Sequence, residues 1–288
     1  MVPAVPAAAA PVGSRPLRVP GPWWRRAAKY RAILSMSASN NLAYAGESLL
    51  RSIFLVLIIF IFVQLWNVTY GILGVQRIGS YTLAQMIWYF AFAEAIMLST
   101  PLLRRKVDDD VKSGELAYRL TKPYFYLGYL AADYAGELGV RFALNFVIGV
   151  GLALLFVGPI PFSAGGVAAT GVVLVGALAL DFLGGLLVSL TAFWFEETSS
   201  LTLIYRRLVM LLGGMMIPLD VFPEPLASIA KALPFSYMVY GPARLWVDPS
   251  PAFFAELVVK LVIALLLAAG LVGLVFRAGQ RNVTVNGG

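Results

Sequence analysis

The residues best suited to chemistry lie in one charged stretch between two apolar blocks, RRKVDDDVKSGELAYRLTKP at 104–123. Three adjacent carboxylates, Asp108, Asp109 and Asp110, offer the oxygen ligands that divalent cations prefer. The same triplet is typical of a solvated acidic helix start, where the helix macrodipole stabilises negative charge. We favour this second interpretation, so the sequence predicts no metal site here.

Composition and missing motifs exclude most catalytic chemistry. The chain holds no Cys and no His, which excludes disulfides, reactive thiols, Cys/His metal centres and histidine acid–base catalysis. The patterns G-x-x-x-x-G-K-[ST], HExxH and GxSxG are also missing. We therefore expect that this chain is not an enzyme and carries no cofactor of its own.

Two carboxylates fall in the middle of long apolar blocks, at Glu94 and Asp181. Because a charge inside a membrane is costly, such residues either line a path for cargo or ions or make hydrogen bonds between helices. For Asp181 we favour an interhelical role, with Arg141 as one candidate partner. Three methionines follow in the fifth predicted span: Met210, Met215 and Met216. They form either a deformable apolar surface on a translocation path or part of the packed core.

A membrane fold must position these residues. Hydrophobic residues make up 60% of the chain and charged residues 13%, and the mean hydropathy is +0.81. A water-soluble globule could not hide so much apolar surface, so lipid must solvate the chain. Continuous apolar blocks favour helices over a β-barrel. We predict an all-α membrane protein with six transmembrane helices, at 52–73, 81–100, 134–157, 167–194, 201–218 and 253–276.

Flanking segments complete the predicted organisation. Residues 1–22 are rich in Pro and Ala, which predicts a disordered tail. Residues 23–50 begin WWRRAAKYR, where aromatic and basic side chains are typical of an interfacial helix on the membrane surface. We assign residues 23–280 to a single transmembrane domain and residues 281–288 to a cytoplasmic tail.

A proline-rich but apolar loop joins the fifth and sixth predicted spans. Pro225 is expected to begin a short helix, LASIAKAL, and Pro234 to end it. We predict that this helical loop re-enters the outer leaflet, where its backbone must be covered by protein or by a water-filled cavity. The residues assigned to this outer gate loop are Pro223, Pro225, Pro234 and Phe235.

Lysine and arginine residues indicate the orientation. They crowd the amino-terminal segment, the loop after the second span and the tail, and they are sparse in the other loops. The positive-inside rule then places both termini and the 104–123 stretch in the cytoplasm. The net charge of +7 reflects this asymmetry and suits anionic lipid headgroups, so we predict lipid contacts and no nucleic-acid partner.

The 104–123 stretch therefore connects two spans on the cytoplasmic side. It is short and helix-forming, Gly114 interrupts it, and Leu116 and Leu120 fall on one helical face. A short helix with charged groups around a small apolar face is typical of a docking element for a soluble partner. A solvated loop that only sets topology is the alternative, and these residues alone do not choose between the two.

Four stretches resemble the permease subunits of type-2 ABC transporters, most closely the bacterial six-span branch. SGELAYRLTKPYFY is similar to the cytoplasmic coupling-helix region, and IPLDVFPEPLASIAKALPFSYMVYGPARLW is similar to the outer loop. LAYAGESLLRSIFLVLIIFIFVQLW and SYTLAQMIWYFAF resemble the first two spans. The resemblance covers roughly residues 28–278. Similar permeases often carry Arg after a Tyr in the first helix, where this chain has Ala45-Gly46.

This resemblance implies a function and a set of partners. Such permeases pair with a second copy or a sister permease in the bacterial plasma membrane, above two ATPase subunits that hold ATP and Mg. They mostly export drugs, lipids, peptides or natural products, which suits an amphipathic or hydrophobic substrate. The residues that would couple to the ATPase are Val111, Lys112, Ser113, Gly114, Glu115, Leu116 and Arg119.

Two other functions compete with this interpretation. A secondary transporter driven by an ion gradient predicts internal repeats with paired broken helices, and the sequence shows no convincing repeat. A membrane-embedded enzyme acting on lipid predicts clustered His or carboxylate groups at one interface, and His is missing.

Overall fold

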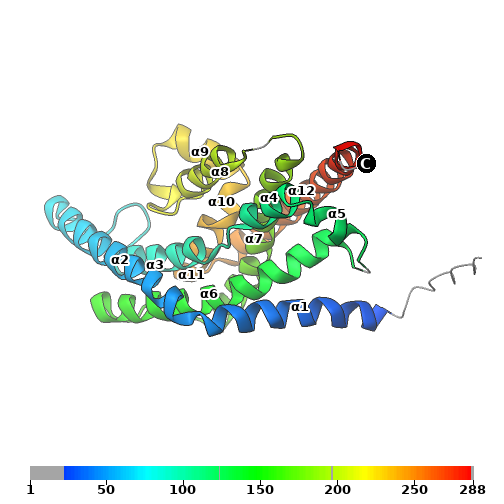
Figure 1. Cartoon of the computed structure of the whole chain (residues 1–288). Helices are drawn as coiled ribbons and strands as arrows, with labels where there is room; N and C mark the ends of the chain where they lie inside the picture. The colour runs from blue at the N-terminus through cyan, green and yellow to red at the C-terminus, as the bar shows by residue number, and fades with distance from the viewer. Residues whose placement is uncertain (1–22, 123, 196, 287–288) are drawn as a thin grey trace, which may run out of the picture.

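A computed structural model describes residues 23–286 except residues 123 and 196 (Figure 1). Within these residues the chain is helical, and β-structure is limited to one isolated bridge between Ile78 and Tyr81. The predicted tail at 1–22 and the last two residues, 287–288, lie outside the described part. The all-α fold class predicted from the sequence is confirmed for the residues described.

The described chain forms twelve α-helices and two short 3-10 helices. They are α1 (Trp23–Ala43), α2 (Ala45–Leu73), α3 (Leu83–Ser99), α4 (Leu103–Lys112), α5 (Glu115–Leu120), α6 (Tyr126–Val157), α7 (Ala164–Leu190), η1 (Thr191–Phe193), α8 (Ser199–Leu212), η2 (Leu219–Val221), α9 (Glu224–Ala232), α10 (Phe235–Met238), α11 (Tyr240–Val247) and α12 (Pro251–Asn286). Helix α12 continues past residue 280, so no helix end marks the predicted boundary of the tail.

Four segments of the described chain are long and apolar enough to cross a membrane: Ile53–Leu73, Tyr126–Val157, Ala164–Phe193 and Pro251–Gln280. They match the first, third, fourth and sixth predicted spans. Helix α3 has 17 residues and α8 has 14. At 1.5 Å per residue these two helices measure only ~26 and ~21 Å, against a hydrocarbon core of ~30 Å. The chain is a multi-pass membrane protein, and its six-span layout stays a prediction.

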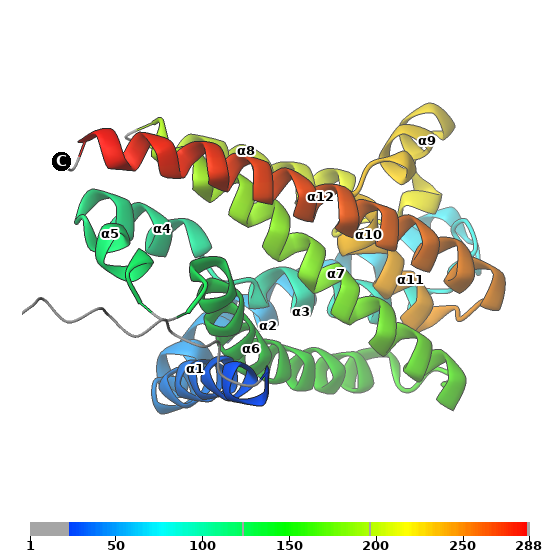
Figure 2. The ribbon, with the colours of Figure 1, turned by 90° about the vertical axis from the view of Figure 1, so that its right-hand side faces the viewer.

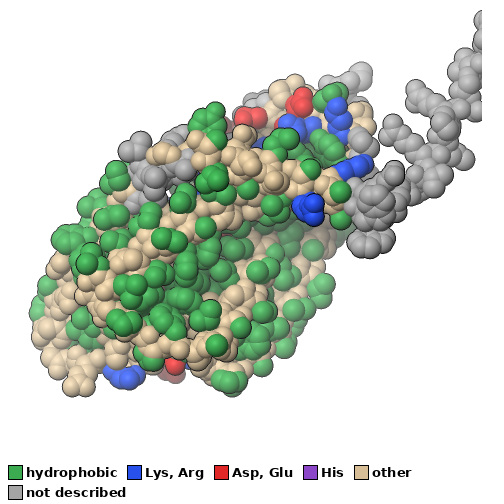
Figure 3. Space-filling model, turned by 90° about the horizontal axis from the view of Figure 1, so that it is seen from below, with side chains coloured by type: hydrophobic (Ala, Val, Ile, Leu, Met, Phe, Trp, Pro, Cys, Tyr) green, Lys and Arg blue, Asp and Glu red, His purple; other side chains and the backbone are tan. Residues whose placement is uncertain are grey.

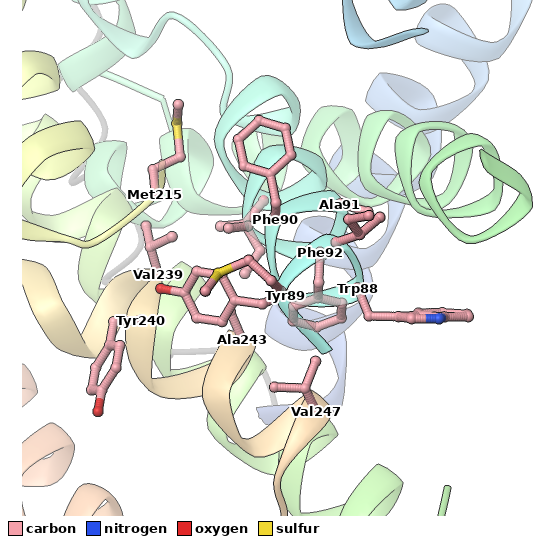
Figure 4. Close-up of a cluster of buried hydrophobic side chains, with 14 of the residues drawn as sticks. Trp88, Tyr89, Phe90, Ala91, Phe92, Met215, Val239, Tyr240, Ala243 and Val247 are labelled. Atoms are coloured by element: carbon pink, nitrogen blue, oxygen red, sulfur yellow. The ribbon is translucent and has the colours of Figure 1, made fainter. Parts of the chain in front are cut away.

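Helix α3 lies inside the bundle, packed on α2, α6 and α11. A capping box begins it, because the Gln85 amide donates to Thr82 Oγ1 at 3.2 Å and the Thr82 amide donates to Gln85 Oε1 at 3.0 Å. Phe92 stacks on Trp246 of α11, with 5.0 Å between ring centroids. Figure 4 shows buried α3 side chains gathered with those of α11 in one apolar cluster.

Helix α1 lies along α6 (Figure 1). Small residues allow this approach, since a Cβ on Gly136 would collide with the Leu34 carbonyl and one on Gly128 with the Tyr30 ring. The helical stretch predicted over 23–50 is divided, because α1 ends at Ala43 and α2 begins at Ala45. The interfacial position of α1 stays a prediction.

The short helices α10 and α11 turn back into the bundle. Six of the eight residues of α11 are buried, and the helix packs on both α3 and α7. The backbone amide of Tyr240 donates to the Gly213 carbonyl at the end of α8, at 2.9 Å, which gives a helix-terminal carbonyl its partner. Protein therefore covers this interrupted backbone, and its re-entry into the outer leaflet stays a prediction.

Charged and apolar surfaces separate along the molecule. The start of α1, helix α5 and the C-terminal end of α12 lie at one end in Figure 1, and Figure 2 shows α9 and α11 toward the end opposite α5. On the face drawn in Figure 3, hydrophobic side chains cover the middle, and charged side chains gather toward two ends. Such a belt suits the hydrocarbon layer of a membrane.

Candidate functional site

Helices α4 and α5 and the turn between them form one compact unit, called here the α4–α5 element. Gly114 in the turn has φ of 73°, a left-handed conformation that favours glycine. The turn lets α5 fold back, so that Arg119 Nε donates to Asp110 Oδ1 at 3.0 Å. The charged stretch is thus an ordered helical pair and not an open loop.

The adjacent carboxylates are not a solvated helix start, and that interpretation is wrong. They lie in the second half of α4, and Asp108 and Asp110 are only 3% and 4% exposed. Two residues along a helix is a rotation of about 200°, so these carboxylates face different neighbours. Asp108 accepts a hydrogen bond from Thr198 Oγ1 at 2.9 Å, and Asp110 accepts one from the Tyr126 hydroxyl at 2.8 Å.

The predicted coupling residues divide into an inward and an outward set. Leu116 is 1% exposed and packs in a buried cluster with Val107. Arg119 faces Asp110 and lies over the Tyr129 ring, 4.9 Å from its centroid. Val111 is half-buried, Glu115 is partly exposed and 3.6 Å from Arg119, and the Lys112 side chain lies outside the description. The exposed residues described in the α4–α5 element are Asp109, Ser113, Gly114, Tyr118 and Leu120.

Helix α4 is also anchored to its neighbours by two polar contacts. Lys106 Nζ lies 2.5 Å from Asp133 Oδ2 of α6. Burial favours a lower pKa for Lys106, but the hydrogen bonds and charges of Asp133 and Tyr129 together outweigh burial and raise the pKa. Arg206 of α8 donates to the Pro101 carbonyl at 3.2 Å, just before α4 begins. The Asp108–Thr198 bond adds a contact at the start of α8. Helix α4 and the residues just before it are therefore held to α6 and to α8.

Asp181 joins three helices. Its carboxylate accepts hydrogen bonds from the Tyr134 hydroxyl of α6 at 2.9 Å and the Tyr205 hydroxyl of α8 at 3.1 Å. The contacts are interhelical, as the sequence favoured, but the partners are tyrosines, and Arg141 pairs instead with Glu137 at 2.5 Å. A cavity of about 30 Å³ beside Asp181 has room for a water molecule.

Glu94 is separate from this network. It is 3% exposed and belongs to the buried residues of α3. It does not line the cavity beside Asp181, so the structure does not bring the two carboxylates of the apolar blocks together. A role for Glu94 on a translocation path stays a prediction.

The three methionines do not share one surface. Met215 is 8% exposed and lies in the core, whereas Met216 is 41% exposed. Met210 is half-buried, and its sulfur accepts from Arg207 Nη1 at 3.7 Å. Core packing accounts for Met215 and for Met210, which packs against the same cluster, whereas Met216 lies outside the core.

A second polar network lies at the α9–α11 end, around Asp220. Its carboxylate accepts from the Tyr81 and Tyr240 hydroxyls at 2.7 and 2.8 Å and from Lys231 Nζ at 2.7 Å. Burial favours a higher pKa for Asp220, but these hydrogen bonds and nearby Arg244 lower it below its ordinary value. Sequence reasoning missed this residue, although an acidic residue at the start of an apolar, proline-rich loop is a usable signal.

The predicted outer loop residues flank the same network. Pro223 precedes α9, Pro225 lies in its first turn, and Pro234 precedes α10. Phe235 begins α10, and its ring centroid lies 6.3 Å from that of Tyr205. Helix α9 therefore occupies the stretch where the sequence predicts a proline-bracketed helix.

The comparison with known families decides the identity. The sequence profile described as ABC-2 family transporter protein matches residues 42–287, which include α2 to α12. The chain belongs to the ABC-2 transporter family. No curated protein matches the sequence. The resemblance to type-2 ABC permeases that the sequence motifs indicate is confirmed.

As an ABC-2 permease, the chain is the membrane component of a transporter and not itself a catalyst. Within the described residues no group of three His, Cys, Asp or Glu side chains could hold a metal ion. What the permease presents instead is an ordered α4–α5 element with an exposed outer face. Hydrogen bonds and an ion pair tie the inner face of that element to α6 and α8.

Proposed function

We propose that this permease exports an amphipathic or hydrophobic cargo across a bacterial plasma membrane, driven by separate ATPase subunits. It would act with a second copy or a sister permease. The α4–α5 element carries the proposal, because it combines exposed groups at Ser113, Gly114 and Tyr118 with a buried, hydrogen-bonded inner face. A docking surface that transmits force needs both properties.

The contacts of α4 suggest how ATP would do work. Closure of the ATPases would displace the α4–α5 element as one unit, because the Arg119–Asp110 bond spans its turn. The Asp108–Thr198 bond and the bond from Arg206 to the Pro101 carbonyl would carry that displacement to α8. ATP can shift the equilibrium only if the ATPase contacts differ between the two states, and the α4–α5 surface is where they would differ.

A matched pair of serines tests the docking surface. Ser113 and Ser228 are both exposed, and each hydroxyl donates to a carbonyl four residues earlier. Ser113→Arg places a bulky charge on the proposed docking face, and Ser228→Arg places the same charge on α9. We expect Ser113→Arg to abolish copurification of the ATPase and cargo-stimulated ATP hydrolysis in proteoliposomes, and Ser228→Arg to leave both intact. Equal behaviour of the two variants would contradict docking at Ser113.

The ion-gradient alternative predicts a different outcome. If an ion gradient drives transport, replacing the phosphate-binding lysine of the partner ATPase would leave transport intact. Under the proposed function the same replacement abolishes transport while the permease still inserts and copurifies with its ATPase. Proteoliposomes with ATP inside or outside, and with the ion gradient collapsed, distinguish the two mechanisms.

A further inference from the structure

Two adjoining cavities near the α9–α11 end form one site with a charged part and an apolar part. The first has a volume of about 200 Å³, and its lining includes Lys231, Arg244 and Lys260. The second has a volume of about 660 Å³ and runs between α7, α10 and α12. Tyr237 and Lys260 line both, so the two spaces meet at these side chains.

Cations outnumber carboxylates around the smaller cavity. Lys231 pairs with Asp220 at 2.7 Å, and the same carboxylate lies 3.6 Å from Arg244. Lys260 pairs with Glu256 at 2.5 Å, one helical turn away. Three cations thus share two carboxylates among the described residues here. Each ammonium has three N–H donors and a guanidinium five, so donors remain for an anionic ligand.

The larger cavity is a groove lined by apolar side chains, with Lys260 as its one charged residue among those described. Leu187 of α7 and Ala264 and Ala268 of α12 are part of its wall. Its volume falls in the range of ~300–1,000 Å³ that is typical of small-molecule sites. Leu267, on the rim, is 71% exposed, so the groove opens toward the lipid-facing side of α12.

The two parts are ordered along α12 as the two parts of a lipid are ordered in a leaflet. Lys260 lies nine residues after the start of α12 at Pro251, ~14 Å along the helix at 1.5 Å per residue. A lysine at that depth can direct its ammonium toward the membrane surface. Ala264 and Ala268 follow one and two turns deeper, beside the hydrocarbon chains.

We propose that this composite site binds an anionic amphiphile with one phosphate or carboxylate group and one acyl chain. The acidic head lies among Lys231, Arg244 and Lys260, and the chain occupies the groove along α12. A zwitterionic head of the same chain length fits less well, because its cationic part meets an excess of like charge. The inference goes beyond the proposed function, since binding needs neither ATP nor an ATPase.

The test uses the full chain purified in a neutral detergent and two probes with the same fluorescent acyl chain. One probe is a lysophosphatidic acid, which is anionic, and the other a lysophosphatidylcholine, which is zwitterionic. We expect the anionic probe to bind about 10-fold more tightly, as charge-assisted hydrogen bonds predict. Equal affinity of the two probes would overturn the proposal.

Three variants locate the site. Lys260→Gln should reduce the preference for the anionic probe several-fold with little effect on the zwitterionic one. Ala268→Trp should block the groove and weaken the binding of both probes. Leu266→Trp, on the exposed side of the same helix at 69% exposure, should weaken the binding of neither.

Two outcomes would contradict the proposal even if one variant fails. If Ala268→Trp does not fold, Lys260→Gln alone decides, because an unchanged preference for the anionic probe contradicts the charged part of the site. Loss of self-association in Ala268→Trp with unchanged probe binding would assign the groove to a second copy and overturn the proposal.

Discussion

The two ends of the permease each hold a carboxylate bound by tyrosine and a cation, but the two networks join different parts of the chain. At the α4–α5 element, Asp110 is bound by Arg119 and Tyr126, which lie 9 and 16 residues away. At the other end, Asp220 is bound by Tyr81, which lies 139 residues away, and by Tyr240, 20 residues away. The first network stiffens one short segment, and the second cross-links distant ones. We infer that the α4–α5 element moves as a unit, whereas the α9–α11 end resists separation.

The largest expected effect is all-or-none and tests whether these two ends lie on opposite sides of the membrane. The chain has no cysteine, so Ser113→Cys and Ser228→Cys each create a single exposed thiol. A membrane-impermeant maleimide should label Ser228→Cys in intact cells and should label Ser113→Cys only after permeabilisation. Labelling of both from the same side would contradict the predicted topology and the comparison built on it.

The next effect concerns stability at the Asp220 end. Asp220→Asn removes the charge that Lys231 and Arg244 share, and we expect unfolding to become easier by about 1–3 kcal/mol at pH 7. The folded state lowers the pKa of Asp220 below its value in the unfolded chain, near 3.8. The charged carboxylate therefore stabilises the fold at pH values above 3.8, and this stabilisation is lost as the pH falls below that value. The gap in thermal stability between wild type and variant should therefore shrink in acid.

The matched control for that measurement is Glu224→Gln. Glu224 is an exposed carboxylate in the first turn of α9, so neutralising it should change stability little. Thermal unfolding in detergent, followed by tryptophan fluorescence at several pH values, gives both numbers. An equal loss in the two variants would show that the Asp220 network does not cross-link this end.

The sequence predicts the elements better than it predicts their contacts. Apolar length alone locates the four long helices, because lipid imposes one requirement on every residue of a span. The end of α8 depends instead on α11, whose Tyr240 amide supplies the partner for the Gly213 carbonyl. The sequence misinterprets Asp108 and Asp110 because their burial depends on contacts with Thr198 and Tyr126. No local sequence pattern connects those two residues to the carboxylates.

A smaller effect should follow from cutting the bond between α4 and α8. Thr198 is fully buried, and its hydroxyl donates to Asp108. Thr198→Val keeps the side-chain shape and removes the donor, which should cost about 1–2 kcal/mol of stability. If this bond transmits motion, cargo-stimulated ATP hydrolysis in proteoliposomes should fall further than basal hydrolysis.

Thr202→Val is the control, because the Thr202 hydroxyl donates to the backbone carbonyl of Thr198 at 3.1 Å, a carbonyl that Thr198→Val leaves in place. It removes a threonine hydroxyl one turn further along α8 without touching α4. An identical loss of stimulated hydrolysis in both variants would mean that α8 is sensitive to any such change and that the Asp108 bond is not the link.

The smallest effect belongs to the turn itself. An added Cβ at Gly114 meets no atom within 4 Å, so Gly114→Ala changes only the backbone preference, and at φ of 73° this should cost about 1–2 kcal/mol. Gly151, inside α6, has equally open surroundings and no positive φ, so Gly151→Ala should instead stabilise by about 0.5–1 kcal/mol. Opposite signs in thermal unfolding would identify Gly114 as a conformational position. The Arg119–Asp110 bond already holds the turn, so we expect Gly114→Ala to destabilise the protein less than Asp220→Asn does. A larger loss of stability in Gly114→Ala would show that the α4–α5 turn contributes more to stability than the Asp220 end.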